Sequence, residues 1–221
     1  LNIIGWRDVP VNAKVVGSIA AQSQPRIKQV FIGKSSPDQS DEEFNLKLYL
    51  ARKISENTIY SSPFSQKNFF YFSSLHTRTI IYKGLLIPED IERFYIDLSN
   101  PKLVTSLALV HQRFSTNTFP TWDLAQPFRY MCHNGEINTL KGNVSRMISR
   151  QELINSKLID EEFLNKIFPI IIPGKSDSAS MDMVLELLLM TGRSLPEIMM
   201  ILVPEALSLI HISEPTRLES I

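Results

Sequence analysis

The chain has 221 residues, of which 43% are hydrophobic and 21% charged, a composition typical of a globular protein with one large domain or two small ones. Its 23 basic and 23 acidic residues balance, which excludes the net basic character that nucleic acids or anionic membrane surfaces normally select. The single cysteine excludes an internal disulfide, and also a zinc or iron–sulfur site built from several thiolates.

The first half of the chain carries mostly strand signals. The β-branched and aromatic run RIKQVFIG, residues 26–33, predicts a strand. After a polar loop, Asp41 is expected to cap a helix over residues 42–55, where apolar residues recur at helical spacing. Two further strand-like runs, residues 68–75 and 78–86, are separated by only two residues and predict a hairpin.

The middle of the chain alternates strand and helix signals. Strands are expected at residues 103–111 and 127–133, with a long polar and aromatic loop between them. A helix is predicted to begin after the Asn-Gly turn at Gly135, because apolar residues then recur at helical spacing. Asp160 is expected to cap a short helix that runs through Phe168.

The last third reads as a buried strand followed by two helices. FPIIIPG, residues 168–174, predicts the strand, and residues 181–191 predict a helix that Gly192 ends. SLPE at Ser194 has the form of a capping box and predicts one more helix. The apolar runs here are far shorter than the ~20 residues of a membrane helix. The order of elements indicates an α+β fold with helices packed on sheets.

Three polar clusters each follow a predicted strand: HQRFSTNT from His111, HNGEIN from His133, and GKSDS from Gly174. Because strand ends meet at one rim of a sheet, we expect the three clusters to line one pocket. GKS does not predict a phosphate-binding loop, because Pro169 stands where that motif requires glycine.

Each cluster offers one chemical group and one plainer alternative. Arg113 has the planar donor fork that binds a carboxylate, or it forms a surface salt bridge. Asn134 and Gly135 can aim two N–H groups at one oxyanion, or they form only a tight turn. Asp177 can bind an ammonium group, or it caps the following helix.

Metal binding is not expected. The four histidines lack the spacing of a helical metal pair. His111 and His133 both end predicted strands, which leaves a joint metal site open, but structural roles for both are the favoured interpretation.

The run LALVHQRFSTNTFPTWDLAQPFRYMCHNGEINTLKGN, together with GWRDVPVN, RTIIYKGLL and GKSDSASMDMVLELLLMTGRSLPEIMM, resembles the glutaminase domain of glutamate synthases, which are class II glutamine amidotransferases. The resemblance covers about residues 5–206. It implies a four-layer α/β/β/α sandwich of the N-terminal-nucleophile hydrolase type, incomplete here at the N-terminus. It also implies that Asn134 and Gly135 form the oxyanion hole.

The resemblance assigns the substrate-binding residues as well. Arg113 is expected to bind the α-carboxylate of glutamine, and Asp177 its α-ammonium group. Thr116 and Glu136 are expected to help hold the substrate.

The nucleophile implied by the resemblance is a cysteine at the mature N-terminus, whose own α-amino group acts as the base. Cys132 does not meet this requirement, because its nitrogen is a mid-chain amide. The implied cysteine is expected to lie upstream of Leu1, so the chain as written is predicted to have no glutaminase activity. Residues 1–206 are therefore expected to be a partial amidotransferase domain, and residues 207–221 a non-native tail.

The implied parent enzyme passes ammonia to a synthase domain that carries FMN and an iron–sulfur cluster and aminates 2-oxoglutarate. No cofactor is expected in this segment. The expected partners are glutamine, the synthase domain, and a small subunit or ferredoxin, and the expected location is the cytoplasm or a plastid. Two alternatives remain open: a non-catalytic module that binds glutamine or glutamate, and a cysteine hydrolase that uses Cys132 with His111 or His133.

Overall fold

Helices dominate the computed structural model, which describes residues 1–114, 118–134, 137, 139–151, 153–156 and 159–203. Thr116, Gly135, Glu136 and the expected domain boundary at residue 206 lie outside these residues. The α-helices are α1 (Ser18–Ala21), α2 (Asp41–Tyr60), α3 (Pro88–Phe94), α4 (Leu140–Gln151), α5 (Glu161–Lys166), α6 (Asp177–Met190) and α7 (Leu195–Leu202). The strands are β1 (Asn2–Asp8) and β2 (Lys28–Gly33), and short 3₁₀ helices cover Ala13–Val15, Lys67–Phe69 and Ile96–Ser99.

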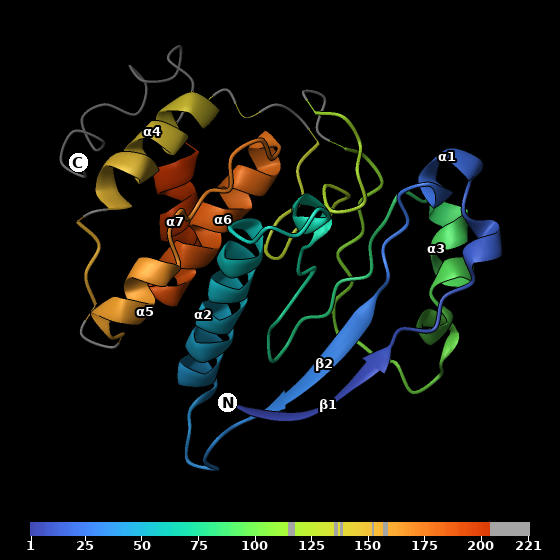
Figure 1. Ribbon diagram of the computed structural model, residues 1–221, viewed down its shortest axis with the longest axis horizontal. Helices are drawn as coiled ribbons and strands as arrows, with labels where there is room; N and C mark the ends of the chain where they lie inside the picture. The colour runs from blue at the N-terminus through green and yellow to red at the C-terminus, as the bar shows by residue number, and fades with distance from the viewer. Residues whose placement is uncertain (115–117, 135–136, 138, 152, 157–158, 204–221) are drawn as a thin grey trace.

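The helices divide into two groups. Figure 1 shows α2 and α4 to α7 gathered on one side, and the sheet with α1 and α3 on the other, with irregular chain between them. The larger hydrophobic core lies within the first group and is centred on α6, whose first eleven residues are all buried. Because α6 is apolar around most of its circumference, it is the central helix of the group.

Strands β1 and β2 form a two-stranded antiparallel sheet. Trp6 pairs with Val30 and Asp8 with Lys28, and the register is irregular between Ile3 and Gly5. The predicted strand at residues 26–33 is confirmed as β2, whereas β1 was not expected. Its run NIIGWRD includes a glycine, which weakens a strand pattern.

A smaller core holds the sheet side together around Phe94 and Trp122. The Trp122 indole N–H donates to the Ala20 carbonyl oxygen at 3.0 Å. Gly84 passes so close to the indole that a Cβ there would lie 2.4 Å from a ring carbon. This close approach explains why glycine stands in the motif YKGLL.

Five expected strands are not formed, at residues 68–75, 78–86, 103–111, 127–133 and 168–174, all of which the structure describes. A strand requires a partner for its backbone N–H and C=O groups, and these segments pair with no neighbouring strand. The prediction rested on β-branched and aromatic residues. These residues are frequent in strands mainly because their side chains pack well on a sheet, and less because their backbone prefers the strand conformation. The α+β prediction holds in its coarser form, as helices with a small sheet.

The expected helices are present, with corrected ends and caps. Ser40, rather than Asp41, caps α2 by accepting from the Glu43 N–H at 3.1 Å. Helix α6 begins at Asp177, four residues earlier than predicted, because Ser176 caps it, and Gly192 ends it with φ +85° as expected. Neither Asp160 nor Ser194 makes a side-chain cap bond, although α5 and α7 start directly after them. Helix α5 ends at Lys166, before Phe168.

Candidate active site

The segment HNGEIN, in which His133, Asn134 and Ile137 are described, is held by side chains at both of its described ends. On one flank, the Gln126 carboxamide forms two hydrogen bonds with His133: the His133 N–H donates to Gln126 Oε1 at 2.7 Å, and Gln126 Nε2 donates to the His133 carbonyl oxygen at 3.0 Å. On the other flank, the Ile137 N–H donates to Asp177 Oδ2 at 3.0 Å. The clusters that begin at His133 and Gly174 are therefore joined directly.

Asp177 is the first residue of α6 and is only 1% exposed. The cap is made by Ser176, whose hydroxyl accepts from the Ala179 N–H at 3.1 Å. The N-cap residue of α6 is therefore Ser176 and not Asp177. Its carboxylate accepts from the N–H groups of Ile137 and Ser178, the latter at 2.7 Å, in the positive field of the helix N-terminus.

The segment before the turn is also fastened to α6. Asp182 accepts from the backbone N–H groups of Arg129 at 3.2 Å and Tyr130 at 2.8 Å. The Phe128 N–H donates to the Met131 carbonyl oxygen at 2.8 Å and closes a tight loop. Arg129, Tyr130 and Ile137 are thus bonded to carboxylates at two levels of α6.

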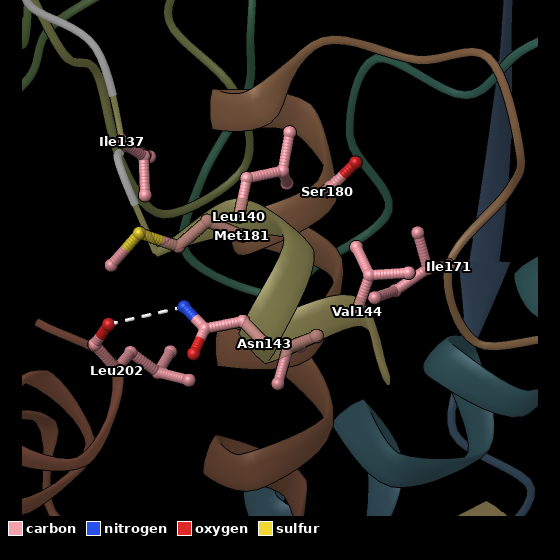
Figure 2. A pocket seen from close by; sticks show the side chains of 9 residues that line it. Ile137, Leu140, Asn143, Val144, Ile171, Ser180, Met181 and Leu202 are labelled. Carbon is pink, nitrogen blue, oxygen red and sulfur yellow. Dashed lines mark hydrogen bonds between the residues drawn. The ribbon is translucent and has the colours of Figure 1, made fainter. Parts of the chain in front are cut away.

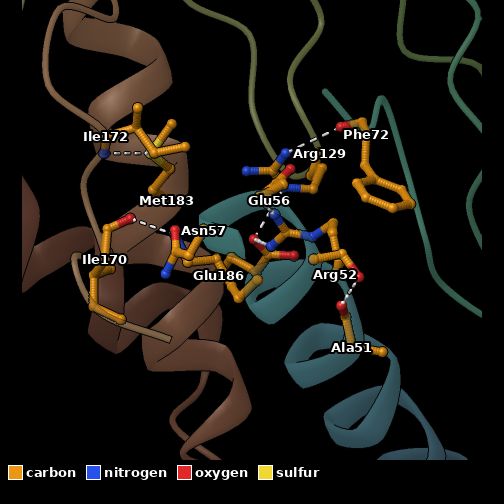
Figure 3. A network of polar contacts seen from close by, with 12 residues as sticks. Ala51, Arg52, Glu56, Asn57, Phe72, Arg129, Ile170, Ile172, Met183 and Glu186 are labelled. Carbon is orange, nitrogen blue, oxygen red and sulfur yellow. Dashed lines mark hydrogen bonds and ion pairs between the residues drawn. The ribbon is translucent and has the colours of Figure 1, made fainter. Parts of the chain in front are cut away.

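A buried ion network supports these contacts. Figure 3 shows Arg52 from α2 and Arg129 both reaching Glu186 on α6; Arg129 Nε lies 2.9 Å from Glu186, and Arg52 also pairs with Glu56 at 2.7 Å. Burial opposes ionisation of Glu186, but the two guanidinium charges outweigh it and lower the pKa of this carboxyl. Burial raises the pKa of Asp182, which has fewer compensating charges.

The third cluster reaches the same helix through Phe114. This ring packs against Leu124, Phe128 and Ala179, and Ala179 lies in the first turn of α6. The neighbouring residue Arg113 is exposed, and its guanidinium forms no ion pair with any described residue. Arg113 is therefore next in sequence to a residue that packs against a cluster containing Ala179 of α6, and its own role remains a prediction.

A buried lysine lies behind the aromatic loop. Lys83 Nζ donates to the Asp123 carbonyl oxygen at 2.7 Å and lies 4.9 Å from the centre of the Phe128 ring. Burial lowers the pKa of Lys83 to about 7. The Asp123 carboxylate pairs with Lys175 at 2.6 Å, so the loop is also attached to the residue just before Ser176.

Cys132 is partly buried, and its thiol makes no hydrogen bond to a histidine among the described residues. Nδ1 of His133 is buried without a hydrogen-bond partner. His111 Nδ1 accepts from the Arg113 N–H at 3.1 Å, which is a local turn contact. The geometry of an activated thiol, a base within hydrogen-bond reach of the sulfur, is therefore not formed at Cys132.

Among the described residues, no group of three or more His, Cys, Asp or Glu side chains is placed to hold a metal ion. No helix in the described part of the chain is long and apolar enough to cross a membrane.

A small cavity of ≈ 10 Å³ lies below the turn, between α4, α6 and α7. Figure 2 shows its apolar walls, which include Ile137 and Met181, and the hydrogen bond that Asn143 donates to the Leu202 carbonyl oxygen at 3.2 Å. Because it has room for about one water molecule, it is a packing gap and not a substrate site.

Sequence analysis missed Gln126, Asp182 and Glu186. Gln126 lies in AQPF, at the end of the long loop in which Arg113 and Thr116 were the residues predicted to be functional. The signal that marks Asp182 and Glu186 is their position within the otherwise apolar helix sequence MDMVLELLL, where carboxylates are buried only when paired. Asn134 is exposed at the turn, and the roles expected of Asn134, Gly135, Arg113, Thr116, Glu136 and Asp177 remain predictions.

The chain is similar to known proteins of one family. The model of the family "Glutamine amidotransferases class-II" matches residues 1–217. The chain is 47% identical over 203 residues to the glutamate synthase (NADPH) large chain of Bacillus subtilis, covering 92% of this chain and 13% of that protein. It is 46% identical over 211 residues to the glutamate synthase (NADH) of Saccharomyces cerevisiae, covering 93% and 10%.

A plant protein matches over the same region. The chain is 45% identical over 206 residues to the chloroplastic ferredoxin-dependent glutamate synthase 2 of Arabidopsis thaliana, covering 93% of this chain and 12% of that protein. The chain thus spans only 10 to 13% of the length of these relatives.

Proposed function

The chain belongs to the class II glutamine amidotransferases, and from this we propose that it forms the glutamine-hydrolysing domain of a glutamate synthase. The observation that carries the proposal is the hydrogen bond from Ile137 to the buried Asp177 carboxylate, which joins two of the clusters at one helix end. Phe114 brings the third cluster to that helix end.

The proposed reaction is acyl transfer. A thiolate attacks the side-chain amide carbon of glutamine, and the carbonyl oxygen becomes an oxyanion that receives hydrogen bonds from the Asn134 amide and the Gly135 N–H. Collapse of this intermediate, with protonation of the leaving nitrogen, releases ammonia and leaves a thioester. Water then hydrolyses the thioester, so that glutamine and water give glutamate and ammonia.

Substrate orientation is proposed to come from charge. The fork of Arg113 binds the α-carboxylate in two parallel hydrogen bonds, and the Asp177 carboxylate faces the α-ammonium group. Thr116 and Glu136 are proposed to complete this end of the site. A planar fork fixes direction as well as distance, so the amide carbon is brought to the nucleophile in one orientation.

The nucleophile is proposed to be an N-terminal cysteine and not Cys132. An α-amine has a pKa near ~8 and accepts a proton close to neutral pH, whereas the nitrogen of an internal residue is an amide. The contacts of Cys132 support this, because no histidine lies within hydrogen-bond reach of its sulfur among the described residues.

The ammonia is proposed to serve reductive amination of 2-oxoglutarate in the synthase part of the protein. FMN and an iron–sulfur cluster would be held there, because one cysteine cannot supply the thiolates of a cluster. The relatives are named for NADPH, NADH or ferredoxin, so a small subunit or ferredoxin is the proposed redox partner. A cytoplasmic or plastid location is proposed with it, and the four-layer α/β/β/α sandwich is proposed for the complete glutaminase domain.

The test is glutamine turnover by the full-length gene product. We expect equimolar glutamate and ammonia from L-glutamine, and we expect Cys132→Ser to keep most of the activity. Heat of glutamine binding without ammonia release would instead indicate a non-catalytic binding module. Loss of turnover in folded Cys132→Ser would show that Cys132 is the nucleophile.

A further inference from the structure

We propose that Gln126 is a positioning residue for glutamine hydrolysis, whose carboxamide fixes the backbone that presents Asn134 to the substrate. This inference rests on the proposed function of the site. Gln126 has no assigned role in the chemistry, and among the described residues of HNGEIN it hydrogen-bonds to His133.

The geometry of the contact is unusual for a side chain. One carboxamide satisfies both the N–H and the carbonyl oxygen of one residue, at 2.7 and 3.0 Å, as a neighbouring strand would. Gln126 is only 5% exposed, so water does not compete well for these bonds. Loss of the partner of either His133 group would leave a backbone polar group unsatisfied in this environment, so the two bonds together favour one orientation of the peptide.

The position of the contact in the chain makes it relevant to catalysis. Asn134 follows His133 directly and is exposed, while Asp177 holds Ile137 on the other side of the turn. The two anchors are four residues apart, and Asn134 stands next to one of them. A donor in an oxyanion hole stabilises charge that develops only in the transition state, so small changes in its direction affect kcat and leave ground-state binding largely unchanged.

The test compares Gln126→Met with a matched control in the full-length gene product. Methionine keeps the length and burial of the side chain and removes both hydrogen bonds. The control is Gln39→Met, because Gln39 is also buried, at 6% exposure, and donates to Glu43 beside the start of α2. We expect Gln126→Met to lower kcat about 10- to 100-fold with less than about a threefold change in KM, and Gln39→Met to change neither.

A second measurement distinguishes a change in the position of Asn134 from a general loss of rigidity at the site. L-Glutamate γ-semialdehyde forms a tetrahedral adduct with a thiolate and therefore places an oxygen in the oxyanion hole. Its inhibition constant is expected to rise in parallel with the loss in kcat in Gln126→Met, while inhibition by L-glutamate stays within about threefold of wild type. Gln126→Glu, which keeps the acceptor and loses the donor, is expected to fall between wild type and Gln126→Met.

Failure of this inference differs from failure of the proposed function. If wild type releases no ammonia from glutamine, the proposed function is wrong. If wild type is active and Gln126→Met behaves like Gln39→Met, or raises KM and the glutamate inhibition constant as much as it lowers kcat, then Gln126 does not position the oxyanion hole. If neither Gln126 variant folds while Gln39→Met does, the role of Gln126 is structural and the inference is also overturned.

Discussion

Asp177 shows how far single residues could be predicted. Its residue type and its place before a helix were visible in the sequence, and so was the plainer alternative of a helix cap. The sequence could not show that Ser176 makes the cap and that the Asp177 carboxylate accepts from Ile137, forty residues earlier. Contacts between residues that are far apart in the sequence depend on the fold, whereas the chemical properties of each side chain are visible in the sequence.

Arg113 is expected to determine substrate affinity. Arg113→Ala removes two charge-assisted hydrogen bonds to the α-carboxylate, so KM for glutamine should rise about 10- to 100-fold, with a smaller change in kcat. Steady-state kinetics of the full-length gene product measure this. Arg26→Ala is the matched control, since Arg26 is an exposed arginine paired with Asp8 on the sheet side. An unchanged KM in Arg113→Ala would remove this residue from the site.

Lys83 is expected to make stability depend on pH. Its pKa is about 7 in the folded protein and ~10.4 when unfolded, so between these values the unfolded chain binds a proton that the folded chain does not. This group therefore makes stability rise with pH from about 7 to about 10, by up to about 1.4 kcal/mol per pH unit.

Pulse proteolysis in urea at pH 7 and 9.5 tests this prediction for Lys83. Wild type and the control Lys47→Met, which replaces a lysine exposed on α2, should show the same pH slope. Lys83→Met should show a flatter slope. Equal slopes in all three proteins would mean that Lys83 remains charged when buried.

At the scale of elements, α6 is the main organising helix. Its carboxylates at 177, 182 and 186 bind the turn, the segment before the turn, and α2, respectively. The helix itself and its end at Gly192 were predictable from local pattern and glycine chemistry. The buried face of α2 was not, because it includes Arg52, Lys53 and Glu56, which a pattern of apolar residues cannot detect.

The network around Glu186 is expected to stabilise this arrangement strongly. Glu186→Gln leaves the buried Arg52 and Arg129 charges without their shared partner, and should lower the free energy of unfolding by about 3 kcal/mol. Urea midpoints from pulse proteolysis measure the change. The matched control is Glu197→Gln, which loosens the exposed pair with Arg193 in the α7 region and should change stability by less than about 1 kcal/mol. Equal effects would show that burial adds nothing to the ion network.

At the scale of the whole molecule, five of the expected strands are not formed, whereas the strand expected at residues 26–33 is present as β2. Residues 103–110 are exposed throughout, with Val104 84% and Leu107 81% accessible, so these apolar side chains have no opposing sheet in the structure. A run of β-branched and apolar residues indicates that a segment would fit into a sheet. It does not indicate that a partner strand is present. The expected meeting of the three clusters at the rim of a sheet is not formed; two of them are joined at the start of α6 by the hydrogen bond from Ile137 to Asp177, and Phe114 of the third packs against a cluster that includes Ala179 of α6.

The central claim is that the turn HNGEIN, held by Gln126 and Asp177, forms the oxyanion hole for glutamine hydrolysis. The most direct measurement is the steady-state kinetics of Asn134→Ala in the full-length gene product. Removal of one donor that acts only in the transition state predicts a fall in kcat of about 10²- to 10³-fold, with KM for glutamine nearly unchanged. A folded Asn134→Ala protein with wild-type kcat, or one in which only KM changes, would contradict the claim.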